Sequence, residues 1–233
     1  MNLNKSENIE ISAGDFWEKK IELYDKFFSE MESYNILMNW HEGQLSDCDK
    51  VLDVGAGIGR LSEKLLKKEK EVVAIDTNVH GLKLLRERIV DEKDRLQTMA
   101  MDASILSFAD DSFDGINAML VLPFIKNPVS FLNEAKRVLK VNGKIVSSGL
   151  SRDSWLVMNG WFKELDGCGR FEGVEKNWDN IFYKLNMEIK NHVHNWCNAH
   201  DIRKLFEEAG LKVEYIGNNP LYKGNGYCVV ARK

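Results

Sequence analysis

The sequence predicts an α/β protein built on a doubly wound, mostly parallel sheet, and three observations indicate this class. Short apolar runs typical of strands alternate with helical patterns along residues 50–149, as in βαβ units. A glycine-rich turn follows the first run, at a place where such sheets bind ligands. With 233 residues, 44% of them hydrophobic, the chain can bury the core of one large domain.

Seven apolar runs are expected to form strands, with helices between most of them. The strands are predicted over residues 51–54, 72–75, 96–101, 115–122, 144–148, 211–215 and 227–231. Asn127 followed by Pro128 predicts the start of the helix before the fifth strand. Gly210 occupies the place of the left-handed residue that ends the last helix. Turn residues at 217–220 and 224–226 predict that the last two strands are antiparallel.

The predicted domain is single and covers residues 1–233. Residues 1–48 carry apolar side chains at helical spacing and are expected to form an N-terminal helical cap. Residues 49–150 form the ligand-binding core, and residues 199–233 a C-terminal helix and strand pair. Residues 151–198, an insertion after the fifth strand, are interpreted as a helical lid rich in aromatic residues, namely Trp155, Trp161, Phe162, Phe171, Trp178, Phe182, Tyr183 and Trp196.

Composition excludes several classes of partner. The 32 basic and 36 acidic residues give a net charge of −4 and no basic surface for a phosphate backbone, so no nucleic acid is expected. No stretch approaches the roughly 18 apolar residues that a membrane span requires, so no membrane insertion is expected. Residues 1–10 lack the apolar region of a secretion signal, and the cysteines lack C-x-x-C spacing. We therefore expect a cytoplasmic monomer or homodimer.

A glycine loop at residues 55–59 is the most informative motif. In the run VLDVGAGIG, an apolar strand leads into Gly55, Gly57 and Gly59 and then into a helix. Glycines there let the backbone turn sharply and approach a ligand closely. The G-x-G-x-G spacing differs from the G-x-G-x-x-G of dinucleotide sites, which disfavours a nicotinamide-dependent oxidoreductase. Asp53, two residues before the first glycine, suits a ligand that carries an ammonium group.

Two more acidic residues follow the next strands. Asp76 ends the second strand, seventeen residues after Gly59, where a carboxylate accepts both hydroxyls of a ribose. Asp102 ends the third strand, and with Ala103 it suits the amino group and a ring nitrogen of adenine. Because the carboxyl ends of parallel strands share one edge of the sheet, the three acids are expected to form one wall of a nucleoside site.

Five motifs, in order, carry a resemblance to a known family: VLDVGAGIGRLSEKL, VVAIDTN, MAMDAS, SFDGINAMLVLPFI and LNEAKRVLKVNGKIV. They resemble class I S-adenosylmethionine-dependent methyltransferases of the small-molecule type, similar to the quinone-biosynthesis enzymes. The resemblance is specific over residues 48–150 and weaker over residues 200–231. It implies the strand order 3-2-1-4-5-7-6 with strand 7 antiparallel, and S-adenosylmethionine as the cofactor.

The resemblance also implies roles for individual residues. The methionine part of the cofactor would contact the glycine loop with Ala56, the ribose would contact Asp76 beside Thr77, and the adenine would contact Asp102 and Ala103. Ala118 and Met119, at the end of the fourth strand, would line the cofactor cleft. The family often has histidines after this strand, where this chain has Pro123 and Phe124. That difference removes a candidate general base.

The expected reaction is methyl transfer to an oxygen, nitrogen or carbon nucleophile of a small molecule. A sulfonium donor already carries a good leaving group, so proximity and exclusion of water drive the in-line displacement. A base is needed only if the acceptor must lose a proton. Weak candidates are Tyr24, His41 and His194, followed by Tyr34, His80, His192 and His200. No metal is expected, because His192 and His194 lack a convincing set of further ligands.

The acceptor site is expected outside the common core. Its candidate residues are aromatic: Trp17, Tyr24, Phe124, Trp155, Trp161 and Trp178. An equally weighted alternative is that the lid aromatics only pack the lid onto the sheet. By resemblance, the helix that carries Trp17 and Tyr24 would fold over the methionine end of the cofactor.

Two other functions remain open from the sequence. The same cofactor supports non-methyl chemistry, either aminocarboxypropyl transfer or an intramolecular cyclisation, and both release methylthioadenosine. The other alternative is a catalytically silent partner subunit that binds the cofactor. Intact glycines and all three acids argue against loss of cofactor binding, but they do not establish turnover.

Overall fold

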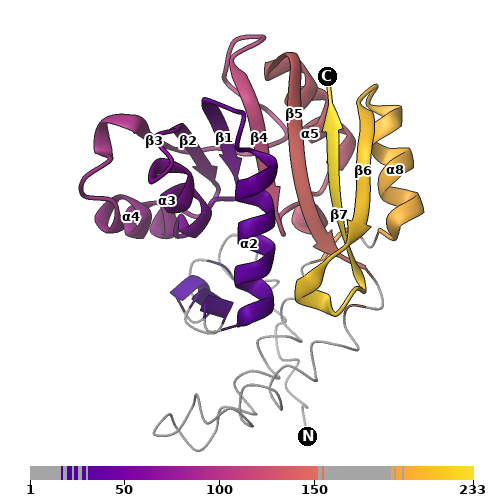
Figure 1. The fold of residues 1–233 in the computed structure, drawn as a ribbon, viewed down its shortest axis with the longest axis horizontal. Coiled ribbons are helices and arrows are strands. Elements are labelled where there is room, and N and C mark those ends of the chain that lie inside the picture. The colour runs from indigo at the N-terminus through magenta and orange to yellow at the C-terminus, as the bar shows by residue number, and fades with distance from the viewer. Residues whose placement is uncertain are drawn as a thin grey trace, which may run out of the picture.

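A seven-stranded mixed sheet forms the centre of the molecule in the computed structural model (Figure 1). The structure describes residues 17, 20–22, 24–25, 28–29, 31–151, 154, 190–191, 193–195 and 197–233. The strand order is β3-β2-β1-β4-β5-β7-β6. Strand β7 is antiparallel to both of its neighbours, and the other pairs are parallel. The predicted fold class and strand order are therefore confirmed.

All seven predicted strands are present, with changed bounds. They are β1 (Lys50–Val54), β2 (Glu71–Asp76), β3 (Leu96–Ala100), β4 (Phe113–Met119), β5 (Leu139–Leu150), β6 (Lys212–Asn218) and β7 (Gly226–Arg232). Strand β4 ends three residues before its predicted end, because Leu120 adopts a positive φ of 60° and a 3-10 helix, η2 (Leu122–Phe124), follows. Strand β5 begins five residues early, because the turn at Asn142 forms an irregularity inside the strand.

Five α-helices have described bounds: α2 (Glu32–Gln44), α3 (Arg60–Leu66), α4 (Val79–Arg88), α5 (Pro128–Val138) and α8 (Ala199–Glu208). Two short 3-10 helices, η1 (Lys93–Arg95) and η3 (Pro220–Tyr222), lie in loops. The Asn127 side chain accepts a hydrogen bond from the backbone of Ser130, as expected for an N-cap. Gly210 has a φ of +73°, which confirms its predicted place after the last helix.

The two faces of the sheet are covered by different helices. Residues Leu52 and Val54 of β1 pack with α5 and α8, while Val51, which precedes them, packs with α3 and α4. Alternation of side chains along a strand produces this division. It places Asp53 on the α3 side, the same side that α2 crosses in Figure 1. The edge strands β3 and β6 are more exposed than the central ones.

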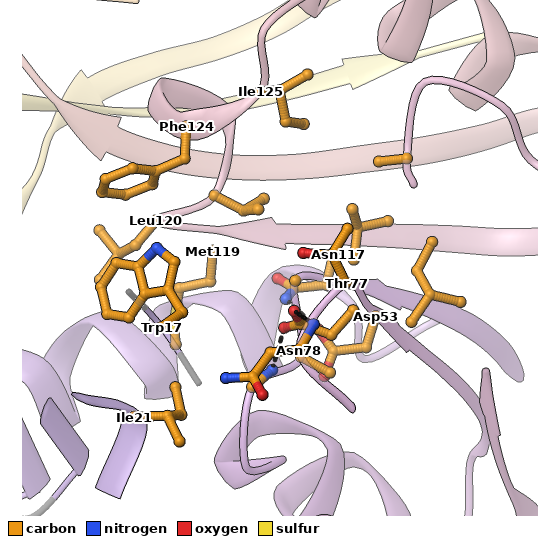
Figure 2. Close-up of a pocket in the computed structure, with 18 of the residues that line it drawn as sticks. Trp17, Ile21, Asp53, Thr77, Asn78, Asn117, Met119, Leu120, Phe124 and Ile125 are labelled. Atoms are coloured by element: carbon orange, nitrogen blue, oxygen red, sulfur yellow. Dashed lines mark hydrogen bonds between the residues drawn. The ribbon is translucent and has the colours of Figure 1, made fainter. Parts of the chain in front are cut away.

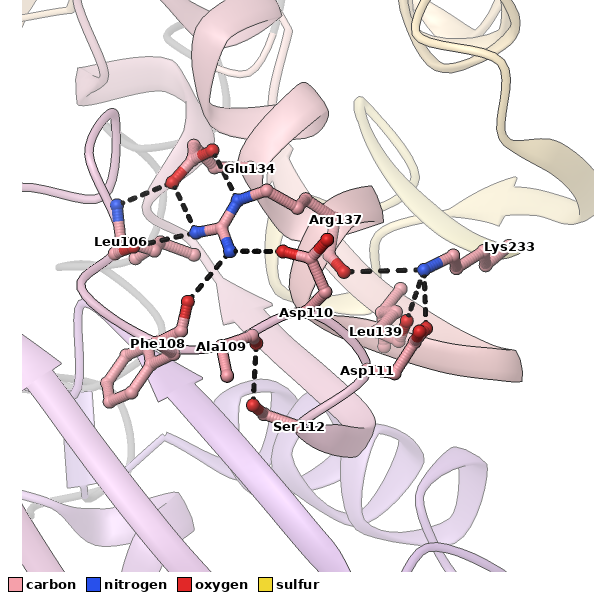
Figure 3. Close-up of polar contacts among 10 residues, drawn as sticks. All are labelled: Leu106, Phe108, Ala109, Asp110, Asp111, Ser112, Glu134, Arg137, Leu139 and Lys233. Carbon is pink, nitrogen blue, oxygen red and sulfur yellow. Dashed lines mark hydrogen bonds and ion pairs between the residues drawn. The ribbon is translucent and has the colours of Figure 1, made fainter.

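The loop between β3 and β4 is fastened to α5 by Arg137 (Figure 3). The guanidinium donates to both carboxylate oxygens of Glu134 at 2.8 Å, to the Asp110 carboxylate at 2.8 Å, and to the backbone oxygens of Leu106 and Phe108 at 2.7 Å. Planar, charge-assisted bonds of this kind hold geometry well. The loop that follows Asp102 is therefore held to α5.

Described residues between 17 and 29 are helical and contact α3 and α4 through charges. Arg60 forms two bonds to the Asp25 carboxylate, one of them 2.7 Å long from Nη2, and Arg88 lies 3.7 Å from the same group. His80 pairs with Glu22 at 2.8 Å. Most of the predicted lid, residues 151–198, lies outside the described residues. No helix within the described residues is long and apolar enough to cross a membrane.

Candidate active site

A pocket of about 430 Å³ opens at the carboxyl ends of β1, β2 and β4 (Figure 2). This volume lies in the range of small-molecule sites, and the position is the one where doubly wound sheets bind ligands. Polar side chains of Asp53, Asn78 and Asn117 gather near the centre of the view, and Trp17 and Phe124 lie together to their left. The pocket therefore has a polar end and an aromatic end.

The glycine loop adopts backbone angles that favour glycine at all three predicted positions. Gly55, Gly57 and Gly59 have φ values of +67°, +55° and +78°. A Cβ on Gly55 would lie 2.4 Å from Cγ2 of Val121, so this glycine also permits the close approach of Val121, the residue before η2. The loop continues from β1 into α3, and Gly59 accepts the first helical bond, from Glu63. Ala56 lies between these glycines and lines the pocket with them.

Asp76 joins the loop to the second strand. Its Oδ2 accepts a bond of 2.8 Å from the backbone of Gly57, and its Oδ1 accepts one of 2.8 Å from the backbone of Asn78. Burial raises the pKa of this carboxyl, and the bonds from the two backbone groups act in the opposite direction. Asp76 and Thr77 both line the pocket, so a carboxyl group that accepts hydrogen bonds is present where a ribose was expected.

Asp53 lies deeper, at the floor of the polar end, with an exposed fraction of 2%. Its Oδ2 accepts a 2.5 Å bond from the Ser62 hydroxyl, and its Oδ1 accepts a 2.7 Å bond from Nδ2 of Asn117. Burial raises the pKa of Asp53 to about 6, although the two side-chain bonds favour the ionised form. The carboxylate has lone pairs left for a cationic ligand group.

The third predicted acid, Asp102, lies at the open side of the pocket. Its side chain is exposed and accepts a 2.8 Å bond from the backbone of Ser104. Ala103 and Met101 line the pocket beside it. The three acids thus face one pocket, but they differ in enclosure: Asp53 and Asp76 are sequestered, whereas water competes for Asp102.

The aromatic end is formed by rings that meet edge to face. The ring centroids of Trp17 and Tyr24 lie 5.2 Å apart, those of Trp17 and Phe124 lie 5.5 Å apart, and both pairs are inclined at 89°. Such contacts favour a fixed arrangement of the rings. Tyr34 also lines this pocket. Trp17, Tyr24 and Phe124 are therefore brought together, whereas Trp155, Trp161 and Trp178 lie outside the described residues.

The candidate bases have different surroundings. Tyr24 lines the pocket, but burial raises its pKa well above the ordinary value for a phenol, and nearby Tyr222, Tyr34 and Asp25 add to this effect. His194 also lines the pocket, and its backbone N–H donates to the Pro123 carbonyl at 2.8 Å. The remaining candidates are divided: Tyr34 lines the pocket, His41, His80 and His200 do not, and His192 lies outside the described residues.

Two predicted residues need correction. Ala118 does not line the pocket but is fully buried against α5, because its neighbours Asn117 and Met119 point to the opposite face of β4. His41 is also fully buried and bonds to the Ser148 hydroxyl at 2.8 Å. Burial lowers the pKa of His41 to about 3, so it is neutral and enclosed, which is unsuitable for a base that must reach the acceptor.

The lining residues that were not among the expected site residues include Asp25, Arg60, Asn78 and Asn117. Asn78 caps α4 by accepting a 3.0 Å bond from the backbone of Gly81, and its exposed fraction is 3%. A signal for Asn117 was available, because a polar residue interrupts an otherwise apolar strand run. Asp25 and Arg60 belong to segments whose contact depends on tertiary structure. Within the described part of the chain, no group of three or more His, Cys, Asp or Glu side chains could hold a metal ion.

Comparison with known proteins agrees with this architecture. Residues 52–147 match the methyltransferase domain family. A demethylmenaquinone methyltransferase of Renibacterium salmoninarum is 36% identical over 106 residues, which are 46% of this chain and 43% of that protein. An uncharacterized protein of Methanocaldococcus jannaschii is 29% identical over 198 residues, or 84% of this chain and 80% of that protein. The chain thus spans less than half the length of the first relative.

A solved structure shares the fold over nearly the whole chain. The [4+2]-cyclase SpnF matches with a TM-score of 0.69 and 16% identity, over 94% of both chains. At this identity the likeness concerns the fold alone. Residues 52–147 thus match the methyltransferase domain family, and the strand order and the glycine loop at the edge of the sheet agree with that match.

Proposed function

We propose that this protein binds S-adenosylmethionine in the pocket and transfers its methyl group to a small-molecule nucleophile. The observation that carries the proposal is one pocket that joins a glycine loop and three acids at one end to a set of aromatic rings at the other. The polar end fits an adenosyl and amino-acid ligand, and the aromatic end offers room for an acceptor.

Individual residues fit the cofactor by their chemistry. The close-packed glycine loop would approach the methionine part, where a side chain on Gly55 would instead clash with Val121. Asp53 would accept the ammonium group, Asp76 with Thr77 the ribose hydroxyls, and Asp102 with Ala103 the adenine. Bound S-adenosylmethionine supplies a methyl group on a sulfonium, and its transfer leaves neutral S-adenosylhomocysteine.

The chain's own contribution is to position the acceptor and exclude water. In such a transfer the acceptor lone pair would form the new bond to the methyl carbon while the carbon–sulfur electrons returned to sulfur, so the residues would not have to stabilise a difficult leaving group. Trp17, Tyr24 and Phe124 would hold a small, partly apolar acceptor in line by ring contacts. The atom that is methylated, whether oxygen, nitrogen or carbon, follows from the acceptor that fits these rings.

His194 is the proposed base where the acceptor carries a proton to be lost. The position after β4 has Pro123 and Phe124, and the backbone of residues 194 and 195 bonds to the Pro123 carbonyl at 2.8 and 3.0 Å. A histidine distant in sequence thus lies beside this position and lines the pocket. Tyr24, whose pKa is raised well above its ordinary value, would stay protonated and donate a hydrogen bond instead.

Calorimetric titration of the purified full chain with S-adenosylhomocysteine tests the proposal, with NAD as the control ligand. We expect micromolar binding of S-adenosylhomocysteine and no heat with NAD. An acceptor screen with S-adenosylmethionine, followed by mass spectrometry, then identifies the methylated product. Absence of binding to S-adenosylhomocysteine contradicts the proposal, and binding of NAD alone would favour an oxidoreductase.

A second reaction class uses the same cofactor without methyl transfer. One observation favours this second reaction class. The chain shares its fold with a protein named a [4+2]-cyclase, so this architecture also serves chemistry other than methylation. Product analysis separates the two: methyl transfer releases S-adenosylhomocysteine, whereas aminocarboxypropyl transfer or internal cyclisation releases methylthioadenosine. Detection of neither product, together with intact cofactor binding, would indicate a silent partner subunit.

A further inference from the structure

A series of buried polar side chains crosses the sheet beneath the pocket. Asp53, Asn117 and Ser148 belong to the neighbouring strands β1, β4 and β5, while His41 comes from α2 and Ser62 from α3. None of the five has an exposed fraction above 2%. Buried polar groups are costly unless they bond to one another, so the pairing of these groups is informative.

The series has two bonded segments, and each contains a buried polar atom without a hydrogen-bond partner. In the first, Asp53 accepts from Ser62 at 2.5 Å and from Nδ2 of Asn117 at 2.7 Å. In the second, Nε2 of His41 lies 2.8 Å from Oγ of Ser148. Among the described residues, Oδ1 of Asn117 and Nδ1 of His41 have no hydrogen-bond partner. The Asn117 side chain nevertheless acts on the imidazole, partly offsetting the effect of burial that lowers the pKa of His41.

The charge on Asp53 fixes the direction of every bond in the series. A carboxylate accepts only, so Asn117 must present its Nδ2 to Asp53 and turn its Oδ1 away. A neutral imidazole has one N–H and one lone pair, and an acceptor such as Oδ1 of Asn117 requires the N–H on Nδ1. Nε2 of His41 then accepts from the Ser148 hydroxyl. In the other tautomer, Nδ1 of His41 and Oδ1 of Asn117 would both be buried acceptors, and neither could supply a proton to the other.

We propose that His41, as its Nδ1–H tautomer, and Asn117 are positioning residues that hold the Asp53 carboxylate for the ammonium group of the cofactor. With Nδ1 of His41 as donor to Oδ1 of Asn117, all donors of the series point toward Asp53. The inference rests on the proposed function, because it assigns the polar floor to the amino-acid end of S-adenosylmethionine. It extends the binding site to a side chain on α2 that does not itself line the pocket.

Two probes separate this role from a general effect on folding. S-adenosylhomocysteine carries the ammonium group, and 5′-methylthioadenosine shares its adenosine but lacks the amino acid. We expect Asn117→Leu to lower the affinity for S-adenosylhomocysteine about tenfold or more. The affinity for methylthioadenosine should change by less than about twofold. His41→Phe should lower the affinity for S-adenosylhomocysteine about fivefold. His41→Gln, which restores a side-chain N–H, should recover most of that loss of affinity. Equal weakening of both ligands in Asn117→Leu would overturn the proposal.

Serines on β5 provide a matched control. Ser148→Ala removes the donor to His41, whereas Ser147→Ala removes an equally buried hydroxyl that bonds to the Ala118 carbonyl at 3.0 Å on the other face. We expect only Ser148→Ala to lower the preference for S-adenosylhomocysteine over methylthioadenosine. The same change in both variants would contradict the proposal.

Nitrogen NMR of the histidine rings tests the tautomer without any ligand. The His41 signals, assigned by their loss in His41→Gln, should show a protonated Nδ1 and an unprotonated Nε2 at neutral pH. A protonated Nε2 overturns the proposal. If the wild type binds neither S-adenosylhomocysteine nor methylthioadenosine, the proposed function fails, whereas wild-type binding with unchanged selectivity in the variants rejects only the further inference.

Discussion

The two ends of the pocket are held together by different forces. At the polar end, Asp53 and Asp76 each accept two hydrogen bonds of 2.5 to 2.8 Å from neighbouring elements. At the aromatic end, Trp17, Tyr24 and Phe124 meet through ring edges and faces. The polar end therefore has fixed directions of bonding, and the aromatic end has a fixed shape with few directional groups.

This difference separates two tasks. Hydrogen-bonding groups select strongly for a ligand that can pair with all of them. Such selectivity suits a site that always binds the same cofactor. Apolar surfaces discriminate by size and shape and do so less sharply. We therefore expect changes at the polar end to affect cofactor binding, and changes at the aromatic end to affect mainly the acceptor.

The largest effect is expected from Gly55→Val, at the junction of the two ends. Its positive φ and the 2.4 Å approach to Val121 leave no place for a side chain, so the free energy of unfolding should fall by about 3 kcal/mol. Denaturant titration measures this loss. Gly43→Ala in α2, where a Cβ meets nothing within 4 Å, is the control and should raise stability by about 0.5–1 kcal/mol. Equal tolerance of both changes would mean that the loop is not packed as described.

A smaller but specific effect is expected from Asp76→Asn. The amide keeps the shape, but only one of its two polar atoms accepts, so it cannot retain both backbone bonds and still serve a ribose. Affinity for S-adenosylhomocysteine should fall by about tenfold to a hundredfold in calorimetry. Asp102→Asn, at an exposed carboxylate, should lower the affinity for S-adenosylhomocysteine by less than about fivefold. The reverse order would show that the open side of the pocket dominates binding.

Acid is expected to weaken the cofactor complex through Asp53. Because burial raises the pKa of Asp53 to about 6, lowering the pH from 7 to 5 protonates it and should reduce affinity for S-adenosylhomocysteine about tenfold. For the folding stability of the protein without ligand, acid has the opposite effect. The folded protein takes up this proton more readily than the unfolded chain, so protonation of Asp53 adds stability below pH 4 that is lost as the pH rises through 6.

The variant Asp53→Asn separates this carboxyl from Asp76, whose pKa is also raised by burial. Calorimetry of the variant between pH 5 and 7 should show a flatter pH dependence than that of the wild type. The affinity for 5′-methylthioadenosine, which lacks the ammonium group, should show the same pH dependence in both proteins. A wild-type affinity that rises on acidification would contradict the assignment of Asp53.

The aromatic end should respond in the opposite way. Phe124→Ala removes one edge-to-face contact with Trp17, and we expect kcat/KM for any accepted substrate to fall about tenfold. Affinity for S-adenosylhomocysteine should stay within about threefold. Phe108→Ala is a matched control, because Phe108 makes a similar contact with Phe113 at 5.1 Å but does not line the pocket. Similar losses of activity in both variants would remove the distinction between the two ends.

The smallest effect is expected where the N-terminal helical residues meet α4. Glu22 and His80 form an exposed pair, with side-chain exposures of 69% and 35%, so Glu22→Gln should change the free energy of unfolding by less than about 0.5 kcal/mol. Asp25→Asn should cost more, because Asp25 is 14% exposed and two arginines approach its carboxylate. Thermal unfolding of the two variants compares them, and a larger loss for Glu22→Gln would contradict this order.

Much of the polar end was predictable from the sequence. Strand tips, the glycine loop and the acids Asp76 and Asp102 are local features, and the parallel topology brings their carboxyl ends to one edge. The cap at Asn127 and the left-handed Gly210 are local for the same reason. Each of these depends on a few adjacent residues and on backbone geometry.

The remaining features depend on register and on contacts distant in sequence. Ala118 was assigned to the wrong face of the sheet, because a shift of one residue along a strand exchanges the two faces. The apolar run also continues past Leu120, so it did not indicate where the strand ends. His41 and Asn117 are separated by many residues, and neither residue alone indicates that the other is near. Burial then decides the chemistry, since it makes His41 a neutral structural group and not a base.

The reversed direction of β7 has a practical consequence for handling the protein on a surface. Because β7 runs against the strands whose carboxyl ends form the pocket, Arg232 leaves the sheet at the opposite edge, where Figure 1 marks the C-terminus. Lys233 is anchored there by its ammonium group, which bonds to the carbonyl of Leu139 at 2.7 Å. A peptide tag added after residue 233 and captured on a biosensor chip would therefore orient the pocket toward the flowing solution.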